Sequence, residues 1–429
     1  MRLAPSVGWV FSPLDEELGL LPGEYTPHLH ECLVRLSAWM PFEEAVKTVA
    51  GILRVRVSIS KAVRATEAAG AVYVTMQNEE VTELERKAPS APAGAEQMVF
   101  SGDGVMVPVL HGEWKEVRTL VIGEVSATST GEVRTQAQSY FSRLASAEEF
   151  TRLALVETHR RGVENSRRVG AVVDGAEWLQ GFIDHHAPKA VRILDFAHAA
   201  EHIAAIACLL PHETSDAAQE WLTTRLHTLK HEGPDKLLAE LRQLQTQQPD
   251  NQLLADHLTY LAKRKEQMRY PEFIQQGWPI GSGIVESANK LVVEARLKGA
   301  GMHWQPANVN PMLALRNILC SNRWDEAWPQ IEQRLHCLTT RKRYQQCQQR
   351  FQSRCAKAIA AKLANTPTPA TLPPSPLPPN APSDLQPQDP TLSSLPALPR
   401  KPHRPPSDHP WRRSPIGSAR YRSPQSAKS

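Results

Sequence analysis

"RVGAVVDGAEWLQGFIDHHAPKAVRILDFAHAAEHIAAIACLL", residues 168–210, contains two short apolar runs, each followed by a longer segment. The runs, residues 168–175 and 189–195, have the length and composition of buried strands. The segments after them, residues 176–187 and 196–210, have the periodicity of helices. Because strands that alternate with helices form parallel sheets with crossover connections, this stretch predicts an α/β fold.

The residues before this stretch add a hairpin to the predicted sheet. Residues 98–110 and 113–125 are rich in β-formers and meet at "HGE", which is typical of a β-hairpin. Residues 140–162 predict a long helix. The expected order is therefore hairpin, helix, strand, helix, strand, helix, and we expect residues 97–210 to form the first part of an α/β core.

The rest of the chain is predicted to be helical and then disordered. Residues 211–275 are polar with helical patterns and no strand signal, which indicates an all-α insertion. Residues 276–363 continue as helices and complete the core. Residues 364–429 are rich in Pro and Ser and end in a basic part. That composition cannot offset its ordering entropy by apolar burial, so we expect a disordered tail.

The N-terminal region, residues 1–84, is predicted to be helical. One helix covers residues 42–53, and a second begins with Ser58 as its N-cap and ends at Gly70. Two short helices with cations near their junction suggest a DNA-binding helix-turn-helix. The alternative is an ordinary helical hairpin with solvated charges. The cations are Arg54, Arg56, Lys61 and Arg64.

Composition limits the class of protein. The 429 residues carry a formal net charge of +4, which permits a nucleic-acid partner without requiring one. The six cysteines are scattered and form no C-x-x-C pair, which argues for a reducing compartment. No apolar run approaches the roughly 18 residues of a membrane span. We expect a cytoplasmic protein that makes no membrane contact.

Three acids lie where ligands bind in α/β proteins. Asp174 ends the strand "VGAVVD", and Asp103 lies in the first predicted strand, which can pair with it. Glu286 lies in the first turn of the helix after the loop 281–283. Three such carboxylates would bind two Mg²⁺ or Mn²⁺ ions for phosphodiester chemistry. The alternatives are a turn at Asp103-Gly104 and a helix cap at Asp174.

The segments "VVDGAEWL", "ILDFAHAAEH" and "GSGIVESANKLVVEARLKGAGMHW" resemble the ISKra-type insertion-sequence transposases of the Mutator-like DDE superfamily. The resemblance covers roughly residues 10–345. It implies an RNase H-like catalytic core interrupted by an all-α insertion. It also implies that Asp103, Asp174 and Glu286 are the metal-binding acids, with Glu113 a nearby alternative to Asp103.

Asp195-Phe-Ala-His198 matches the Cys/Asp-x-x-His signature that follows the second acid in related transposases. Asp195 also ends a strand and competes with Asp174 for the role of second acid. In an RNase H-like sheet the fourth strand lies beside the first and the fifth lies one position further out. We therefore keep Asp174 as the ligand and give Asp195 and His198 a supporting role. The alternative for Asp195 is a helix N-cap.

The same segment contains His198-Ala-Ala-Glu201-His202, the pattern of inverted zinc peptidases. On a helix both histidines share a face, so two zinc ligands are geometrically feasible. Neighbouring apolar residues such as Ile203 and Ile206, however, indicate that this helix is packed in the protein. We therefore prefer the transposase hypothesis to a zinc site.

Cations follow Glu286 along the chain. Lys290, Arg296 and Lys298 are candidates for contacts with DNA phosphates, and the alternative is a solvated helix face. Trp304 is a candidate for stacking on a flipped base, and the alternative is a core tryptophan.

These features predict a DNA transposase that cleaves element ends and joins the 3′-hydroxyl to target DNA. Its partner is double-stranded DNA, and synapsis of two ends implies a homo-oligomer. Family members often carry a cysteine-bearing segment upstream of the region that matches "WVFSPLDEELGL", residues 9–20, so truncation is an open alternative. A truncated DNA-binding protein without catalysis and a metal-dependent nuclease without integration are the rival functions.

Overall fold

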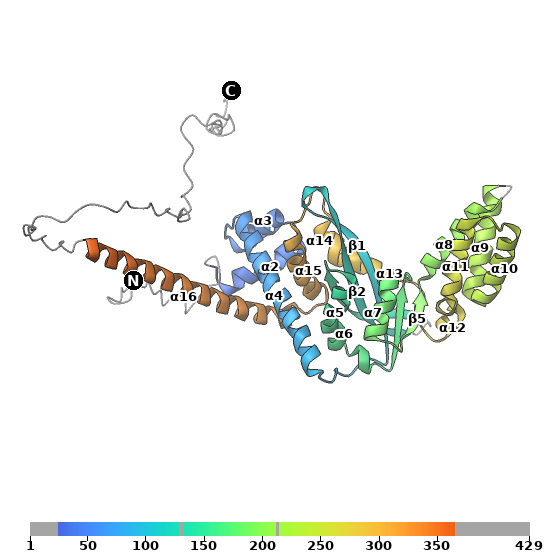
Figure 1. The fold of residues 1–429 in the computed structure, drawn as a ribbon, viewed down its shortest axis with the longest axis horizontal. Helices are drawn as coiled ribbons and strands as arrows, with labels where there is room; N and C mark the ends of the chain where they lie inside the picture. Colours follow the sequence, from blue (N-terminus) through green and yellow to red (C-terminus); the bar gives the residue numbers. More distant parts are fainter. Residues whose placement is uncertain (1–24, 128–132, 212–213, 365–429) are drawn as a thin grey trace, which may run out of the picture. The chain divides into compact units, whose positions relative to one another are not determined.

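The computed structural model describes residues 25–127, 133–211 and 214–364. These residues form a mixed α/β structure around a five-stranded sheet (Figure 1). The strands are β1 (Gln97–Pro108), β2 (Trp114–Ala127), β3 (Val133–Arg143), β4 (Arg168–Val173) and β5 (Val191–Leu194). Their order across the sheet is β3-β2-β1-β4-β5. The pairs β1–β2 and β2–β3 are antiparallel, whereas β1–β4 and β4–β5 are parallel.

The parallel half of the sheet is covered on both faces, as its continuous apolar runs predict. Val172 and Ile193 face one core cluster, together with side chains of α8 (Phe196–Leu209). Ala171 and Val173 face the opposite cluster, together with side chains of α7 (Glu177–His186). The crossover helices α7 and α8 therefore lie on opposite faces, and the predicted alternation of strands and helices is confirmed.

The predicted hairpin is also confirmed, but the helix predicted for residues 140–162 begins too early. Tyr140–Arg143 belong to β3, and the helices here are α5 (Ala147–Leu153) and α6 (Leu155–Arg160). Ser146 caps α5, because its side chain accepts a hydrogen bond from the main-chain N–H of Glu149. β3 lies at the edge of the sheet, and the exposed positions of its first half are Arg134, Gln136 and Ala137. A strand of that kind has little apolar signal.

The N-terminal helices pack with the last helices of the chain into a separate core. They are α2 (Pro27–Trp39), α3 (Phe42–Leu53), α4 (Ile59–Lys87), α15 (Pro306–Cys320) and α16 (Trp324–Ala364). Ser58 caps α4 as predicted, but the predicted end at Gly70 is wrong, because α4 continues to Lys87. A Cβ at position 70 would overlap the main chain of Pro311, so this glycine lets α4 approach α15 closely.

The region predicted as an all-α insertion consists of helices and their connections and contains no strand among its described residues. Its helices are α9 (Ser215–Glu232), α10 (Pro234–Gln247), α11 (Gln252–Lys263), a 3₁₀ turn (Lys265–Met268) and α12 (Tyr270–Gln275). They share one hydrophobic cluster with α8. The chain then forms α13 (Gly283–Ala288), a π-helix (Asn289–Glu294) and α14 (Ala295–Leu297).

No helix among the described residues is both long enough and apolar enough to cross a membrane. The tail predicted to be disordered, from residue 365 on, lies outside the described residues, as do residues 1–24.

Candidate active site

β1 and β4 bring Asp103 and Asp174 together. The parallel pairing runs from Gln97 opposite Arg168 to Phe100 opposite Ala171. The same offset, carried three residues further along both chains, places Asp103 level with Asp174, which directly follows β4. The negative charge of Asp174 acts on Asp103 and contributes to raising its pKa. The neighbourhood expected for these two acids is therefore present.

Asp103 is held by hydrogen bonds to both carboxylate oxygens. The N–H of Gly104 donates to Oδ1 at 2.7 Å, and Nδ2 of Asn289 donates to Oδ2 at 2.8 Å. The pKa of Asp103 is raised, first by burial and then by the charges of Asp174 and Glu116, and the two hydrogen bonds oppose the shift. A cation beside this pair would stabilise both ionised carboxylates.

Asp174 lies in a tight turn that the helical insertion holds. Its Oδ1 accepts from the N–H of Ala176 at 2.8 Å. Tyr260 of α11 donates its hydroxyl to the carbonyl of Asp174 at 2.6 Å, and Arg264 donates to the carbonyl of Gly175, also at 2.6 Å. Gly175 has a φ of +83°, and a Cβ there would lie 2.5 Å from atoms of both Tyr260 and Arg264. The insertion therefore fixes the turn that presents the carboxylate.

Glu286 stands apart from the other two acids. It is exposed on α13, a short helix that contacts β1 and β2, and lies three residues before Asn289. Since three residues are about one helical turn, it is one turn from the residue that binds Asp103. Within the described ranges, however, no three side chains of His, Cys, Asp or Glu lie close enough to share a metal ion. The structure pairs Asp103 with Asp174 and does not bring Glu286 to them.

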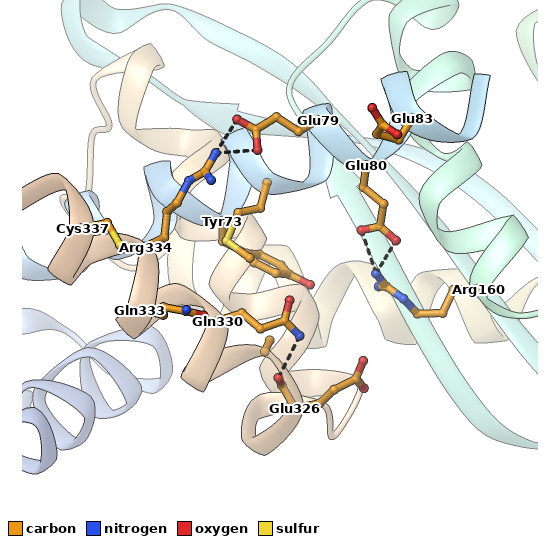
Figure 2. A pocket seen from close by; sticks show the side chains of 12 residues that line it. Tyr73, Glu79, Glu80, Glu83, Arg160, Glu326, Gln330, Gln333, Arg334 and Cys337 are labelled. Carbon is orange, nitrogen blue, oxygen red and sulfur yellow. Dashed lines mark hydrogen bonds and ion pairs between the residues drawn. The ribbon is translucent and has the colours of Figure 1, made fainter. Parts of the chain in front are cut away.

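No described lysine, arginine or histidine forms a salt bridge with Asp103, Asp174 or Glu286. Other acid clusters of the molecule differ. A cavity of about 470 Å³ between α4 and α16 is lined by several acids, two of which are paired with arginines that also line it (Figure 2). Glu79 binds Arg334 there, and Glu80 binds Arg160. The pair Asp103–Asp174 has no such arginine partner among the described residues, and its oxygen donors fit a hard divalent cation.

Asp195 has a different environment, although it also follows a parallel strand. It is only 6% exposed, and its Oδ1 accepts from the N–H groups of Ala197 and Ser282, both at 3.2 Å. Its Oδ2 accepts from the hydroxyl of Ser282 at 2.8 Å. The N-cap alternative is therefore confirmed. Asp195 also ties the loop 281–283, which precedes Glu286, to the start of α8.

His198 and His202 lie in a cluster of aromatic rings. Nδ1 of His198 is 3.3 Å from Oε2 of Glu201. The ring of His202 stacks on Tyr260 with centroids 3.9 Å apart, and its Nδ1 is 2.9 Å from Nδ1 of His257. Burial, with the neighbouring histidines, lowers the pKa of His202 to about 4. Because no three metal-binding side chains converge in the described part of the chain, the structure offers no support for the zinc alternative.

One of the three cations after Glu286 is not available to DNA. Arg296 is 1% exposed, donates from Nε to the carbonyl of Ser37 at 2.8 Å, and lies over the rings of Phe42 and Trp304. The prediction of a phosphate contact is wrong for Arg296, because its guanidinium is buried between helices and rings. Trp304 is likewise a core residue.

The other two cations of this segment remain at or near the surface. Lys290 is exposed, and Lys298 is half-buried with its ammonium 2.8 Å from Glu294. Lys290 therefore stays a candidate for a phosphate contact, whereas Lys298 already has an acidic partner.

The four cations of the predicted helix-turn-helix are exposed around the α3–α4 junction. Arg54 ends α3 in the left-handed conformation, with a φ of 58°. Lys61, in the first turn of α4, lies over the ring of Tyr25 at 5.5 Å. Arg56 and Arg64 complete this basic surface. Their exposure is compatible with either a DNA-binding surface or a solvated one.

Sequence reasoning missed several residues that shape this site. Asn289 has a local signal, since it lies three positions after Glu286 and therefore one turn away. Tyr260 and Arg264 reach the turn after β4 from the insertion, and Ser282 reaches Asp195 across the sheet edge. These three contacts join distant segments, so no local pattern indicates them.

Two comparisons with known proteins give no relative. No protein-family model matches the chain, and no curated protein shows significant sequence similarity to it.

Proposed function

We propose that the chain is a DNA transposase with an RNase H-like core, which cleaves element ends and joins them to target DNA. The observation that carries the proposal is the pairing of Asp103 with Asp174 on neighbouring strands, a pair with which no described lysine, arginine or histidine forms a salt bridge. The strand order β3-β2-β1-β4-β5 supports the proposal. β4, which Asp174 directly follows, lies beside β1, and β5 lies one position further out, as expected of the fourth and fifth strands of an RNase H-like sheet.

In this proposal Asp103 and Asp174 would hold Mg²⁺ or Mn²⁺ through carboxylate oxygens. Glu286, which the structure leaves apart from them, would complete the ligand set only by moving towards the pair. When bound, such ions would activate a hydroxyl and stabilise the leaving oxygen of an in-line phosphodiester displacement. Asn289 orients Asp103 through its amide. Tyr260 and Arg264 fix the main chain at Asp174, and Asp195 positions the loop before α13.

The DNA contacts belong to exposed cations. The surface formed by Arg54, Arg56, Lys61 and Arg64 would bind element ends, and Lys290 would contact a phosphate near the acids. Two ends have to be held together for transposition, so we propose that the protein acts as a homo-oligomer on double-stranded DNA.

A strand-transfer assay with DNA that carries the element ends tests the proposal. In Mg²⁺ or Mn²⁺ the wild-type chain is expected to give cleaved and joined products. Asp174→Ala and Glu286→Ala are expected to give neither product. The control is Glu164→Gln, which alters an exposed acid in the 3₁₀ turn Val163–Asn165, before the start of β4. If both acid variants kept wild-type activity, the assignment would fail.

The position of Glu286 favours one second candidate, a transposase-derived protein that binds element ends without cutting them. A missing third ligand would leave DNA binding intact and remove catalysis. Purified protein that shifts end-bearing DNA but cleaves none of it in Mg²⁺ and Mn²⁺ would support this candidate. Cleaved products without joined ones would indicate a nuclease instead.

A further inference from the structure

The second half of α16 is exposed to solvent wherever the structure describes its side chains. The first half of α16 buries Trp324, Trp328, Ile331 and Leu335 in the N-terminal core. From Thr340 to Ala360, every side chain that the structure describes is exposed. Figure 1 shows this part of α16 extending beyond the other helices. Such a helix gains no stability from burial, so its surface chemistry is its most informative property.

That surface is strongly cationic. The sequence contains no Asp or Glu between Glu332 and the end of α16 at Ala364. Arg350, Arg354 and Lys357 line one shallow groove on the helix, together with glutamines and a serine. Since spacings of four and three residues place side chains on one helical face, these three cations form a single stripe. No described acid forms a salt bridge with them, in contrast to Arg334, which binds Glu79.

We propose that residues 340–360 of α16 form a double-stranded DNA-binding helix, separate from the candidate active site. Lysine and arginine bind phosphates, and their net charge is not neutralised within the helix. The exposed side chains between them include several glutamines, and arginine and glutamine are the side chains that pair with guanine and adenine edges in the major groove. The 21 residues of this segment span about 31 Å, close to one turn of B-DNA.

The chemistry of the helix favours DNA over a membrane surface. The large exposed apolar side chains of this segment are Tyr344, Phe351 and Ile359, each about two turns from the next. Gln348 and Gln352 lie between or beside them. Interfacial helices bury a continuous apolar face in the lipid, and three side chains that are about two turns apart do not supply one.

The test is equilibrium binding of the full chain to a fluorescent 30-base-pair duplex, measured by anisotropy in EDTA between 50 and 200 mM salt. The variant is Arg350→Gln, Arg354→Gln and Lys357→Gln combined. The control is Lys230→Gln, Lys236→Gln and Arg242→Gln, which removes the same charge from exposed positions of α9 and α10. All six side chains are exposed, so both variants are expected to keep the wild-type circular dichroism spectrum.

We expect the α16 variant to bind at least about tenfold more weakly and to lower the slope of log K against log salt by about 2 to 3, since each phosphate contact contributes about 0.9. The control variant is expected to match the wild type. Equal affinities and slopes for the two variants would overturn the proposal. The proposal would also be overturned if the substitutions in α16 weakened binding of the chain to anionic lipid vesicles or to an acidic polypeptide but did not weaken binding to the duplex. Because EDTA prevents metal-dependent cleavage, the outcome is independent of the proposed catalytic function.

Discussion

Asp174 and Asp195 occupy equivalent places in the sheet, directly after the parallel strands β4 and β5, yet their carboxylates differ. Asp195 is buried, and donors of the main chain and of Ser282 occupy both its oxygens. Asp174 accepts one main-chain hydrogen bond and lies beside Asp103. The position at a strand end therefore does not distinguish a ligand from a cap. What distinguishes a ligand from a cap is how many lone pairs of the carboxylate accept no hydrogen bond, and whether a protein cation pairs with its charge.

The largest effect on activity is expected when the charge of Asp174 is removed. Asp174→Asn keeps an oxygen for the N–H of Ala176 but loses the negative charge, so the fold should stay intact. We expect cleavage to fall by about a thousandfold, equivalent to several kcal/mol of charge stabilisation. Single-turnover cleavage and a thermal melt of the same sample check both parts. If the variant lost cleavage activity and its melting temperature also fell markedly, Asp174 would have a structural role instead.

The second prediction concerns Asp195. Asp195→Ala removes the cap of α8 and leaves the N–H of Ala197 and the hydroxyl of Ser282 without their acceptor. We expect the free energy of unfolding to fall by about 2 kcal/mol. Urea denaturation measures this loss. Asp195→Asn is the milder comparison, since its amide retains one acceptor, and it should lie between the wild type and the alanine variant.

A smaller effect is expected at Asn289, which touches only Asp103 of the carboxylate pair. Asn289→Ala removes the donor to Oδ2 of Asp103, so a bound ion would lose an oriented ligand. We expect Mn²⁺ affinity to fall by about tenfold, as is typical for a residue that orients a metal ligand. Asn289→Gln should recover part of that affinity. Unchanged affinity in the alanine variant would limit Asn289 to a packing role.

The smallest effect follows from the raised pKa of Asp103, which burial causes first. A carboxyl with a folded pKa above its unfolded pKa takes up protons on folding. Its stabilising contribution is complete below the unfolded pKa and is lost as the pH rises through the folded pKa. Asp103→Asn should therefore be slightly more stable than the wild type at neutral pH in EDTA and not at pH 3. Melting temperatures at both pH values would reveal a reversed order if the sign is wrong.

Much of the fold could be predicted from local patterns. The apolar runs of β4 and β5, the β1–β2 hairpin and Ser58 as an N-cap each carry a signal within a few residues. β3 could not be recognised, because an edge strand with one polar side lacks a strong apolar pattern. Gly70 resembled a helix end, since only the packing of α4 on α15 explains a glycine inside a helix.

Part of the candidate site could also be predicted from the sequence. Asp103 and Asp174 lie together because strand adjacency follows from the order of the elements. Arg296 resembled a surface cation, and its burial depends on Phe42 and Ser37, which are more than 200 residues earlier. The charge state of a carboxylate pair depends likewise on which distant cations reach it.

Binding of Mn²⁺ to the full chain, followed by the loss of its free electron paramagnetic resonance signal, tests the account most directly. The wild type and Asp195→Asn are predicted to bind Mn²⁺ with similar affinity, and Asp103→Asn with Asp174→Asn combined is predicted to lose that binding. Equal binding by the double variant and the wild type would contradict the assignment of Asp103 and Asp174 as the metal-binding pair.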